Sequence, residues 1–123
     1  MLPIKQVLAA AVIFMGLDFI YLSSFSGFFG NVVQKVQHSP LKMRFAGAAL
    51  CYVALLVALY YFILRQRRSV AEAFLLGVLI YAVFETTNLA LFKDWPWTAV
   101  VLDTTWGGIL FASTTAILRA LRF

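Results

Sequence analysis

The sequence has little charge, one cysteine and one histidine. Charged residues make up 12% of its 123 residues, and the single Cys51 excludes an intramolecular disulfide bond. The CxxC, HExxH and GxGxxG patterns are absent, so the usual signatures of thiol redox, zinc hydrolase and dinucleotide chemistry are missing. His38 lies in a polar segment and is expected to be a solvated loop residue. Cys51 lies in an apolar stretch and is expected to be a small buried side chain.

Hydrophobic residues make up 63% of the sequence, well above the roughly half-apolar composition of soluble domains. They gather in four stretches, each near the roughly 20 residues that a helix needs to cross the hydrocarbon core of a bilayer. These stretches are residues 7–29, 45–64, 73–92 and 98–118. We therefore predict an all-α polytopic membrane protein, with one domain over residues 1–123 and four transmembrane helices in an antiparallel bundle.

The first stretch follows Lys5 and has the general outline of a signal peptide. However, it carries Asp18 and continues through Phe25 and Phe29, which makes it longer than a typical signal-peptide core. We therefore expect it to be a membrane span.

The basic residues are divided unequally between the two ends of the predicted bundle. The end with both termini has Lys5, Arg65, Arg67, Arg68, Arg119 and Arg122, and the other has Lys35, Lys42, Arg44 and Lys93. Positive residues favour the cytoplasmic or matrix side, so we expect both termini there, in a bacterial or organellar inner membrane. Such residues explain the net charge of +5 without nucleic acid, and membrane lipids are the expected partners.

Three carboxylates interrupt the apolar stretches, namely Asp18, Glu85 and Asp103, and no Lys, Arg or His lies in those stretches to neutralise them. A charged side chain near the bilayer centre costs at least about 2.5 kcal/mol, so such residues are rare and usually face the bundle interior. Residue counts, at about 1.5 Å of rise per residue, place all three roughly 8 to 16 Å below the outer face. We therefore predict one layer of acids in the outer half of the bundle.

Each acid is followed three residues later by a hydrogen-bond donor on the same helix face, namely Tyr21, Asn88 and Trp106. Threonine hydroxyls lie nearby but can also bond to their own helix, and two glycines allow a neighbouring helix to approach closely. These supporting residues are Thr86, Thr87, Thr104, Thr105, Gly107 and Gly108. Together they predict a polar pocket lined by spans one, three and four.

Three neighbouring carboxylates in a low-dielectric interior cannot all stay ionised, because burial and like charge both disfavour the ionised form. Protons, a metal cation, a cationic organic ligand or a basic residue of another subunit can neutralise them. Oxygen ligands suit hard cations such as Mg²⁺ or Ca²⁺, but the sequence identifies no particular metal and no cofactor. Alternatively, protonated acids and their donors only hold the helices together.

Two polar features have local explanations. Ser69 is predicted to cap the third stretch, with Glu72 completing a capping box, which separates Glu72 from the acidic layer. Trp95 and Trp97 flank Pro96 and are predicted to anchor the chain at the headgroup level.

The acidic motifs resemble a family of small four-span membrane proteins catalogued as a domain of unknown function. The resembling segments are Leu17–Leu22, Phe84–Ala90 with Trp95 and Pro96, and Asp103–Gly107. In that family the motifs read roughly Asp-x-x-Trp-Leu, Tyr-Asp-Leu-Thr-Asn-Leu-Ala with a downstream Trp-Pro, and Asp-x-x-Trp-Gly. This sequence departs by having Tyr21 for Trp, Phe84 for Tyr, Glu85 for Asp and Thr86 for Leu. The resemblance implies the four-span architecture and the site residues, and it implies no activity.

Three functions are compatible with the sequence. In the first, the acidic pocket binds protons, a cation or a small cationic solute. In the second, the protein is a non-catalytic accessory subunit of a larger membrane complex, such as a respiratory assembly, because its 12 Phe residues can face a partner as well as lipid. A homo-oligomer is the alternative form of association, and it would count against an accessory subunit. In the third, a carboxyl pair performs acid–base chemistry on a lipid. No nucleophile or phosphate-binding group is evident, so the sequence favours a non-enzymatic function.

Overall fold

The computed structural model describes residues 4–123, whose regular structure consists of helices. The elements are α1 (Ile4–Ser24), α2 (Ser26–Gln37), α3 (Phe45–Leu59) with its π-helical continuation η1 (Tyr60–Leu64), α4 (Val70–Leu91) and α5 (Trp97–Ala120). Four segments are long and apolar enough to cross a membrane: Ile4–Ser24, Phe45–Leu64, Val70–Leu91 and Trp97–Ala120. The predicted all-α, four-span architecture is therefore confirmed.

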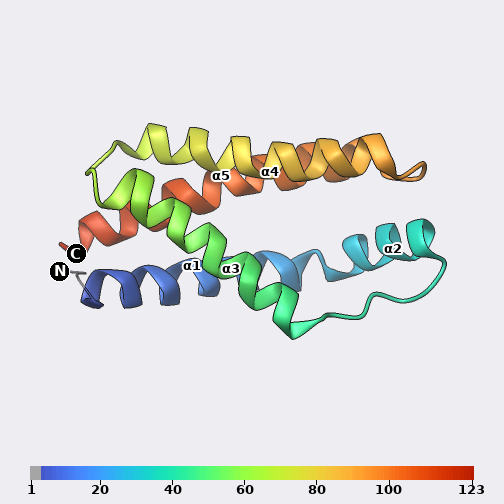
Figure 1. Cartoon of the computed structure of the whole chain (residues 1–123), viewed down its shortest axis with the longest axis horizontal. Coiled ribbons are helices and arrows are strands. Elements are labelled where there is room, and N and C mark those ends of the chain that lie inside the picture. Colours follow the sequence, from blue (N-terminus) through green and yellow to red (C-terminus); the bar gives the residue numbers. More distant parts are fainter. Residues whose placement is uncertain (1–3) are drawn as a thin grey trace.

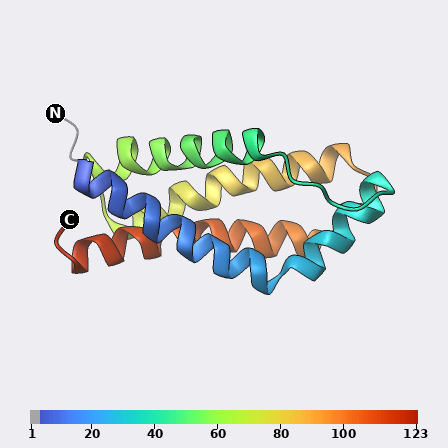
Figure 2. The ribbon, with the colours of Figure 1, turned by 90° about the horizontal axis from the view of Figure 1, so that it is seen from below.

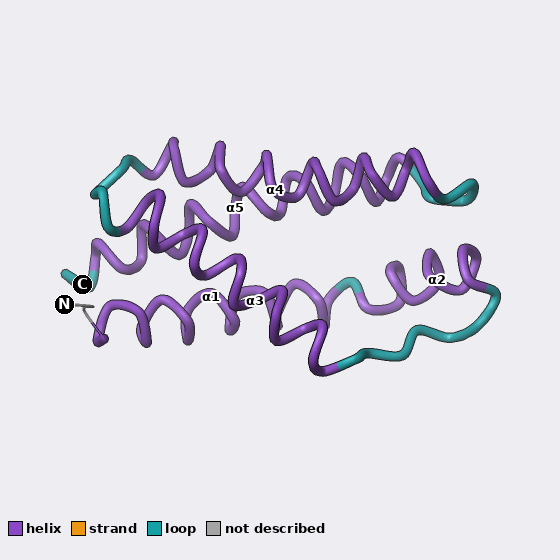
Figure 3. Tube along the Cα trace, in the orientation of Figure 1, coloured by secondary structure: helices purple, strands orange, loops and turns teal. Residues whose placement is uncertain are grey.

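The spans run antiparallel along the long axis of the molecule. The start of α1, the end of α5 and the connection between η1 and α4 lie at one end, and α2 and the α4–α5 connection lie at the other (Figure 1). Seen from the perpendicular direction, α1 crosses α5 obliquely (Figure 2). The connections on either side of α4 are short, whereas a longer irregular segment joins α2 to α3 (Figure 3).

The first predicted stretch is divided into two helices. The chain turns at Phe25, so α1 ends before it and α2 begins after it, and α2 continues to Gln37. Two serine hydroxyls near the turn donate to backbone carbonyls, from Ser24 to Ile20 (2.8 Å) and from Ser26 to Ser23 (3.3 Å). Hydroxyl groups that bond back in this way often bend helices, so local chemistry explains why residues 7–29 do not form one straight span.

The closest helix contact is between α4 and α5, and glycines make it possible. A Cβ atom at Gly77 would lie 2.1 Å from the backbone oxygen of Gly107, and one at Gly108 would lie 2.7 Å from the side chains of Phe74 and Val78. Only residues without a side chain allow the two backbones to approach so closely. The close approach expected of Gly107 and Gly108 is therefore present, and α4 is the helix that approaches.

The apolar core lies toward the end of the bundle that holds the start of α1. Phe14 of α1 is fully buried and packs edge-on against Phe111 of α5 (5.4 Å between ring centroids) and against Tyr52 of α3 (6.3 Å). Leu59 and Leu110 are also fully buried in this cluster. This core joins α1, α3 and α5 directly below the layer of acids.

Cys51 corrects an expectation from the sequence. It is exposed on α3 rather than buried. In a membrane, an apolar side chain meets hydrocarbon whether it faces lipid or protein, so hydrophobicity alone does not predict which of the two it contacts.

The start of α4 has the predicted capping box. The Ser69 hydroxyl accepts a hydrogen bond from the backbone N–H of Glu72 (3.0 Å), and the Glu72 carboxylate accepts one from the backbone N–H of Ser69 (3.2 Å). Glu72 also forms an ion pair with Arg68 (3.4 Å). The prediction that Glu72 acts locally is therefore confirmed.

We expect Gly77→Ala to destabilise the protein. The added methyl group would meet backbone atoms of α5, which cannot move aside as a side chain can, and such overpacking typically costs about 1–3 kcal/mol. Thermal unfolding in detergent micelles, followed by circular dichroism, measures the loss.

Gly16→Ala is the matched control, since a Cβ atom at Gly16 would have no neighbour within 4 Å. This variant should unfold at or above the wild-type temperature, because alanine favours helix. Equal unfolding temperatures for Gly77→Ala and the wild type would contradict the tight α4–α5 contact.

Candidate functional site

Asp18 joins three helices through its carboxylate. It lies in the C-terminal third of α1 and is 6% exposed. The indole N–H of Trp106 on α5 donates to its Oδ1 atom (2.9 Å), and the hydroxyl group of Tyr52 on α3 donates to its Oδ2 atom. Both carboxylate oxygens therefore have a donor, and both donors are neutral aromatic side chains.

Asp103 of α5 belongs to the same cluster, and its donor comes from α1. The Tyr21 hydroxyl on α1 donates to Oδ1 of Asp103 on α5 (3.2 Å). The rings of Tyr21 and Trp106 are stacked, with centroids 4.6 Å apart and an interplanar angle of 2°. The two donors thus lie against each other while each bonds to an acid on the other helix.

These two hydrogen bonds differ from the pairs expected from the sequence. Tyr21 shares a helix face with Asp18, and Trp106 shares one with Asp103, but each donor reaches across to the other helix. Two side chains on one face project in the same direction, toward the neighbouring helix. A long donor therefore meets the neighbour's acid more readily than its own, and the bonds hold α1 against α5.

Glu85 of α4 is the most deeply buried of the three acids, with 1% exposure. Its Oε1 atom accepts a hydrogen bond from the indole N–H of Trp95 (2.8 Å). Its Oε2 atom is buried and meets no N–H or hydroxyl donor among the described residues. The Asp103 carboxyl group is a neighbouring titratable group. Two ionised carboxylates are both acceptors, so a hydrogen bond between them requires a proton.

The other predicted residues divide into two groups. Thr86, Thr87 and Thr105 are exposed, and each hydroxyl donates to a carbonyl group of its own helix, so they do not enter the cluster. Thr104 is half-buried, and its Oγ1 atom is buried without a hydrogen-bond partner in the described chain.

Asn88 and Gly107 differ in how they relate to the acids. Asn88 is half-buried, and its side chain takes no part in the hydrogen bonds of residues 4–123. Gly107 is buried against Gly77 and the Tyr81 ring, where it sets the spacing between the helices that carry Glu85 and Asp103.

Two residues of the cluster were missed by sequence reasoning. Tyr52 brings α3 into a site that was predicted to involve only spans one, three and four, so that expectation is incomplete. The signal was present, because Tyr52 lies seven residues inside its span, at a depth similar to that of the acids. Trp95 was predicted to lie at the membrane surface because it is next to Pro96, yet its indole N–H donates to Glu85.

The chemistry of the cluster is that of carboxyl groups surrounded by neutral donors. Residues 4–123 contain no group of three or more His, Cys, Asp and Glu side chains that could hold a metal ion. The hydrogen bonds that reach the three acids from other residue types come from tyrosine and tryptophan. Such an arrangement can hold and exchange a proton.

We expect Trp95→Phe to destabilise the protein by about 1–3 kcal/mol, because it leaves Oε1 of Glu85 buried without its donor. Trp97→Phe is the matched control, since Trp97 is 68% exposed and its indole takes no part in the hydrogen bonds of the described chain. Unfolding temperatures of the two variants in the same detergent provide the comparison. Equal losses would mean that both tryptophans act only as anchors.

Comparison with known proteins identifies a family but no activity. No curated protein matches the chain, and no solved structure does. Residues 3–120 match the family described as predicted membrane protein (DUF2177). This match is consistent with the resemblance found in the acidic motifs and with the four membrane-spanning helices. Because it covers nearly the whole sequence, the chain belongs to this family of predicted membrane proteins.

Proposed function

We propose that the buried cluster is a proton-binding site, in which Glu85 and Asp103 share one proton. The observation that carries this proposal is the carboxyl pair itself. The carboxyl groups of Glu85 and Asp103 are neighbours, and the buried Oε2 atom of Glu85 has no N–H or hydroxyl donor in the described chain. A proton on one carboxyl group supplies the missing donor and removes one of two adjacent negative charges.

Asp18 has a different environment from the Glu85–Asp103 pair. Both of its oxygens accept hydrogen bonds, from Trp106 and Tyr52. The Asp18 carboxyl group therefore needs no shared proton to supply either oxygen with a donor.

The stacked rings of Tyr21 and Trp106 connect the two parts of the site. Tyr21 bonds to Asp103 and Trp106 bonds to Asp18, while the rings pack face to face. A proton leaving the Glu85–Asp103 pair strengthens the hydrogen bond from Tyr21 to Asp103, because the acceptor becomes charged. Any shift of the Tyr21 ring is then passed to Trp106 and to Asp18.

Proton binding is favoured over the other ligands considered. A metal cation or a cationic solute would compete with the donors that already bond to both oxygens of Asp18 and to one oxygen each of Glu85 and Asp103. Ionisable residues inside membranes often belong to proton relays of pumps and transporters, so proton-coupled transport is the activity to test. Membership of a larger complex, and termini on the cytoplasmic or matrix side, stay predictions.

Infrared spectroscopy of the protein in lipid films tests the shared proton directly. We expect a C=O stretching band of a protonated carboxyl group at neutral pH, which shifts in heavy water. Glu85→Gln and Asp103→Asn should each remove it, because an amide supplies the N–H donor that makes the proton unnecessary. Glu72→Gln is the matched control and should keep the band, since Glu72 lies outside the cluster. A wild-type spectrum without this band at neutral pH would refute the proposal.

Alkaline pH should destabilise the wild-type protein. The stability that comes from the shared proton is complete at acidic pH, where the unfolded chain holds its carboxyl protons too. It is lost as the pH rises, because the unfolded chain then releases the proton freely, whereas the folded site must keep it or hold two adjacent charges in a low-dielectric environment. The unfolding temperature of the wild type should therefore fall more steeply toward alkaline pH than that of Glu85→Gln. Parallel curves for the two proteins would count against the shared proton.

A further inference from the structure

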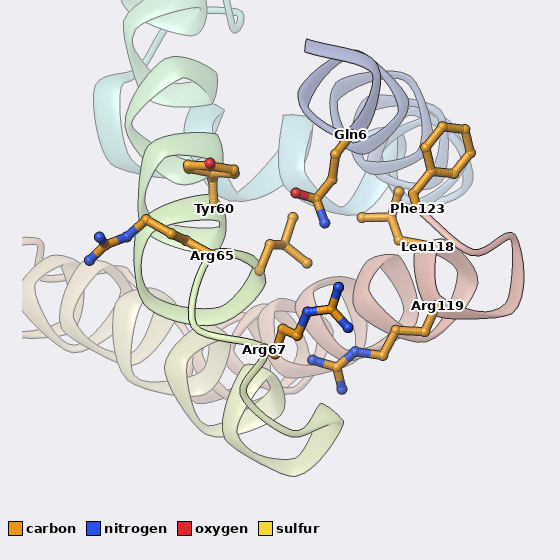
Figure 4. Close-up of a pocket in the computed structure, with 8 residues that line it drawn as sticks. Gln6, Tyr60, Arg65, Arg67, Leu118, Arg119 and Phe123 are labelled. Carbon is orange, nitrogen blue, oxygen red and sulfur yellow. The ribbon is translucent and has the colours of Figure 1, made fainter. Parts of the chain in front are cut away.

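A cavity of about 450 Å³ lies at the end of the bundle opposite to the acids. It opens between the start of α1, the η1 turn and the end of α5, and Figure 4 shows the side chains around it. Its polar lining consists of Gln6, Tyr60, Arg65, Arg67 and Arg119. Leu64, Leu118 and Phe123 add apolar walls, and the two leucines are buried.

The charged side chains that line this cavity are all arginines. The ion pair within residues 4–123 joins Arg68 to Glu72, and neither residue lines the cavity. Arg119 donates a hydrogen bond to the backbone carbonyl of Arg68, which is a neutral partner. The arginines of the cavity therefore keep their full positive charge.

Two of the three arginines are directed toward the same space. Figure 4 shows the guanidinium groups of Arg67 and Arg119 pointing toward one another, while that of Arg65 points away. Arg65 instead lies over the ring of Tyr61, 4.1 Å from its centroid. Arg67 has a left-handed backbone conformation (φ 52°), which is uncommon for a residue with a side chain. Two facing guanidinium groups repel each other unless an anion lies between them.

The lining selects a phosphate group rather than a simple inorganic anion. The planar guanidinium group binds phosphate through paired hydrogen bonds. Gln6 and Tyr60 can bond to ester or glycerol oxygens, and Leu64 and Leu118 match the start of acyl chains. The cavity lies at the ends of the spans, at the depth of lipid headgroups, where basic pockets between helices bind anionic lipids.

We propose that this cavity binds the phosphate headgroup of an anionic phospholipid between Arg67 and Arg119. The lipid neutralises the facing guanidinium groups and joins α1, η1 and α5 at their membrane-surface ends. This site is independent of the proton-binding cluster, which lies at the other end of the spans.

Native mass spectrometry in a neutral detergent, with phosphatidylglycerol or phosphatidylcholine added, tests the proposal. We expect the wild type to bind phosphatidylglycerol at least about tenfold more tightly than phosphatidylcholine, and R67Q to lose about tenfold in affinity, as the loss of a charge-assisted hydrogen bond allows. R67K should fall between them, because lysine keeps the charge and loses the paired geometry.

The controls are a second charge-removing variant and a measurement of helix content. R44Q removes the same charge at the opposite end of the bundle and should bind phosphatidylglycerol as the wild type does. R67Q is the primary variant, because the Arg119 side chain also bonds to the backbone and its replacement can affect folding; circular dichroism checks that R67Q keeps its helix content.

Three results would overturn the proposal. The first is equal affinity for the two lipids, and the second is an R67Q variant that binds phosphatidylglycerol as tightly as R44Q does. The third is displacement of the lipid by inorganic phosphate at an equal concentration, which would assign the cavity to free phosphate. Phosphatidylglycerol binding that depends on Arg67 and resists inorganic phosphate would support the lipid site.

Discussion

The hydrogen bonds that Trp106 and Tyr52 donate to Asp18 join three spans at one carboxyl group, and the bond from Tyr21 to Asp103 adds a second link between α1 and α5. In water such bonds contribute little, because solvent competes for the same groups. In hydrocarbon no solvent replaces them, so a carboxylate that loses its donors becomes very costly. The arrangement of α1, α3 and α5 around the acids therefore depends on the two hydrogen bonds that Asp18 accepts.

The glycine contact between α4 and α5 determines how the remaining acids meet. Gly77 faces Gly107, so the two antiparallel helices are in closest contact within two turns of Glu85 and one turn of Asp103. Side chains lean toward the N-terminus of their own helix. In an antiparallel pair this inclination brings Glu85 and Asp103 toward each other. Apolar packing thus creates the polar pair, and any residue larger than glycine at this crossing would separate the carboxyl groups.

The two ends of the molecule differ in chemistry. One half of the bundle holds a buried network of carboxyl groups and neutral aromatic donors, whereas the opposite end has arginines around an open cavity. The low dielectric of the membrane interior disfavours unpaired charge, and the lipid surface accommodates it. A proton is a suitable ligand in the first environment, and a phosphate group is a suitable ligand in the second.

Much of this protein was determined by local properties of the sequence. Four apolar stretches of span length predict four helices, because hydrocarbon requires every backbone group to bond within its own segment. The Ser69 and Glu72 capping box depends on residues three positions apart and was predicted correctly for the same reason. The tertiary structure alone decided which donor reaches which acid. Tyr21 and Trp106 each bond to the acid of the other helix, and Trp95 and Tyr52 also donate to the acids. A side chain bonds to the group that helix packing brings within reach, whereas helical periodicity describes only one helix at a time.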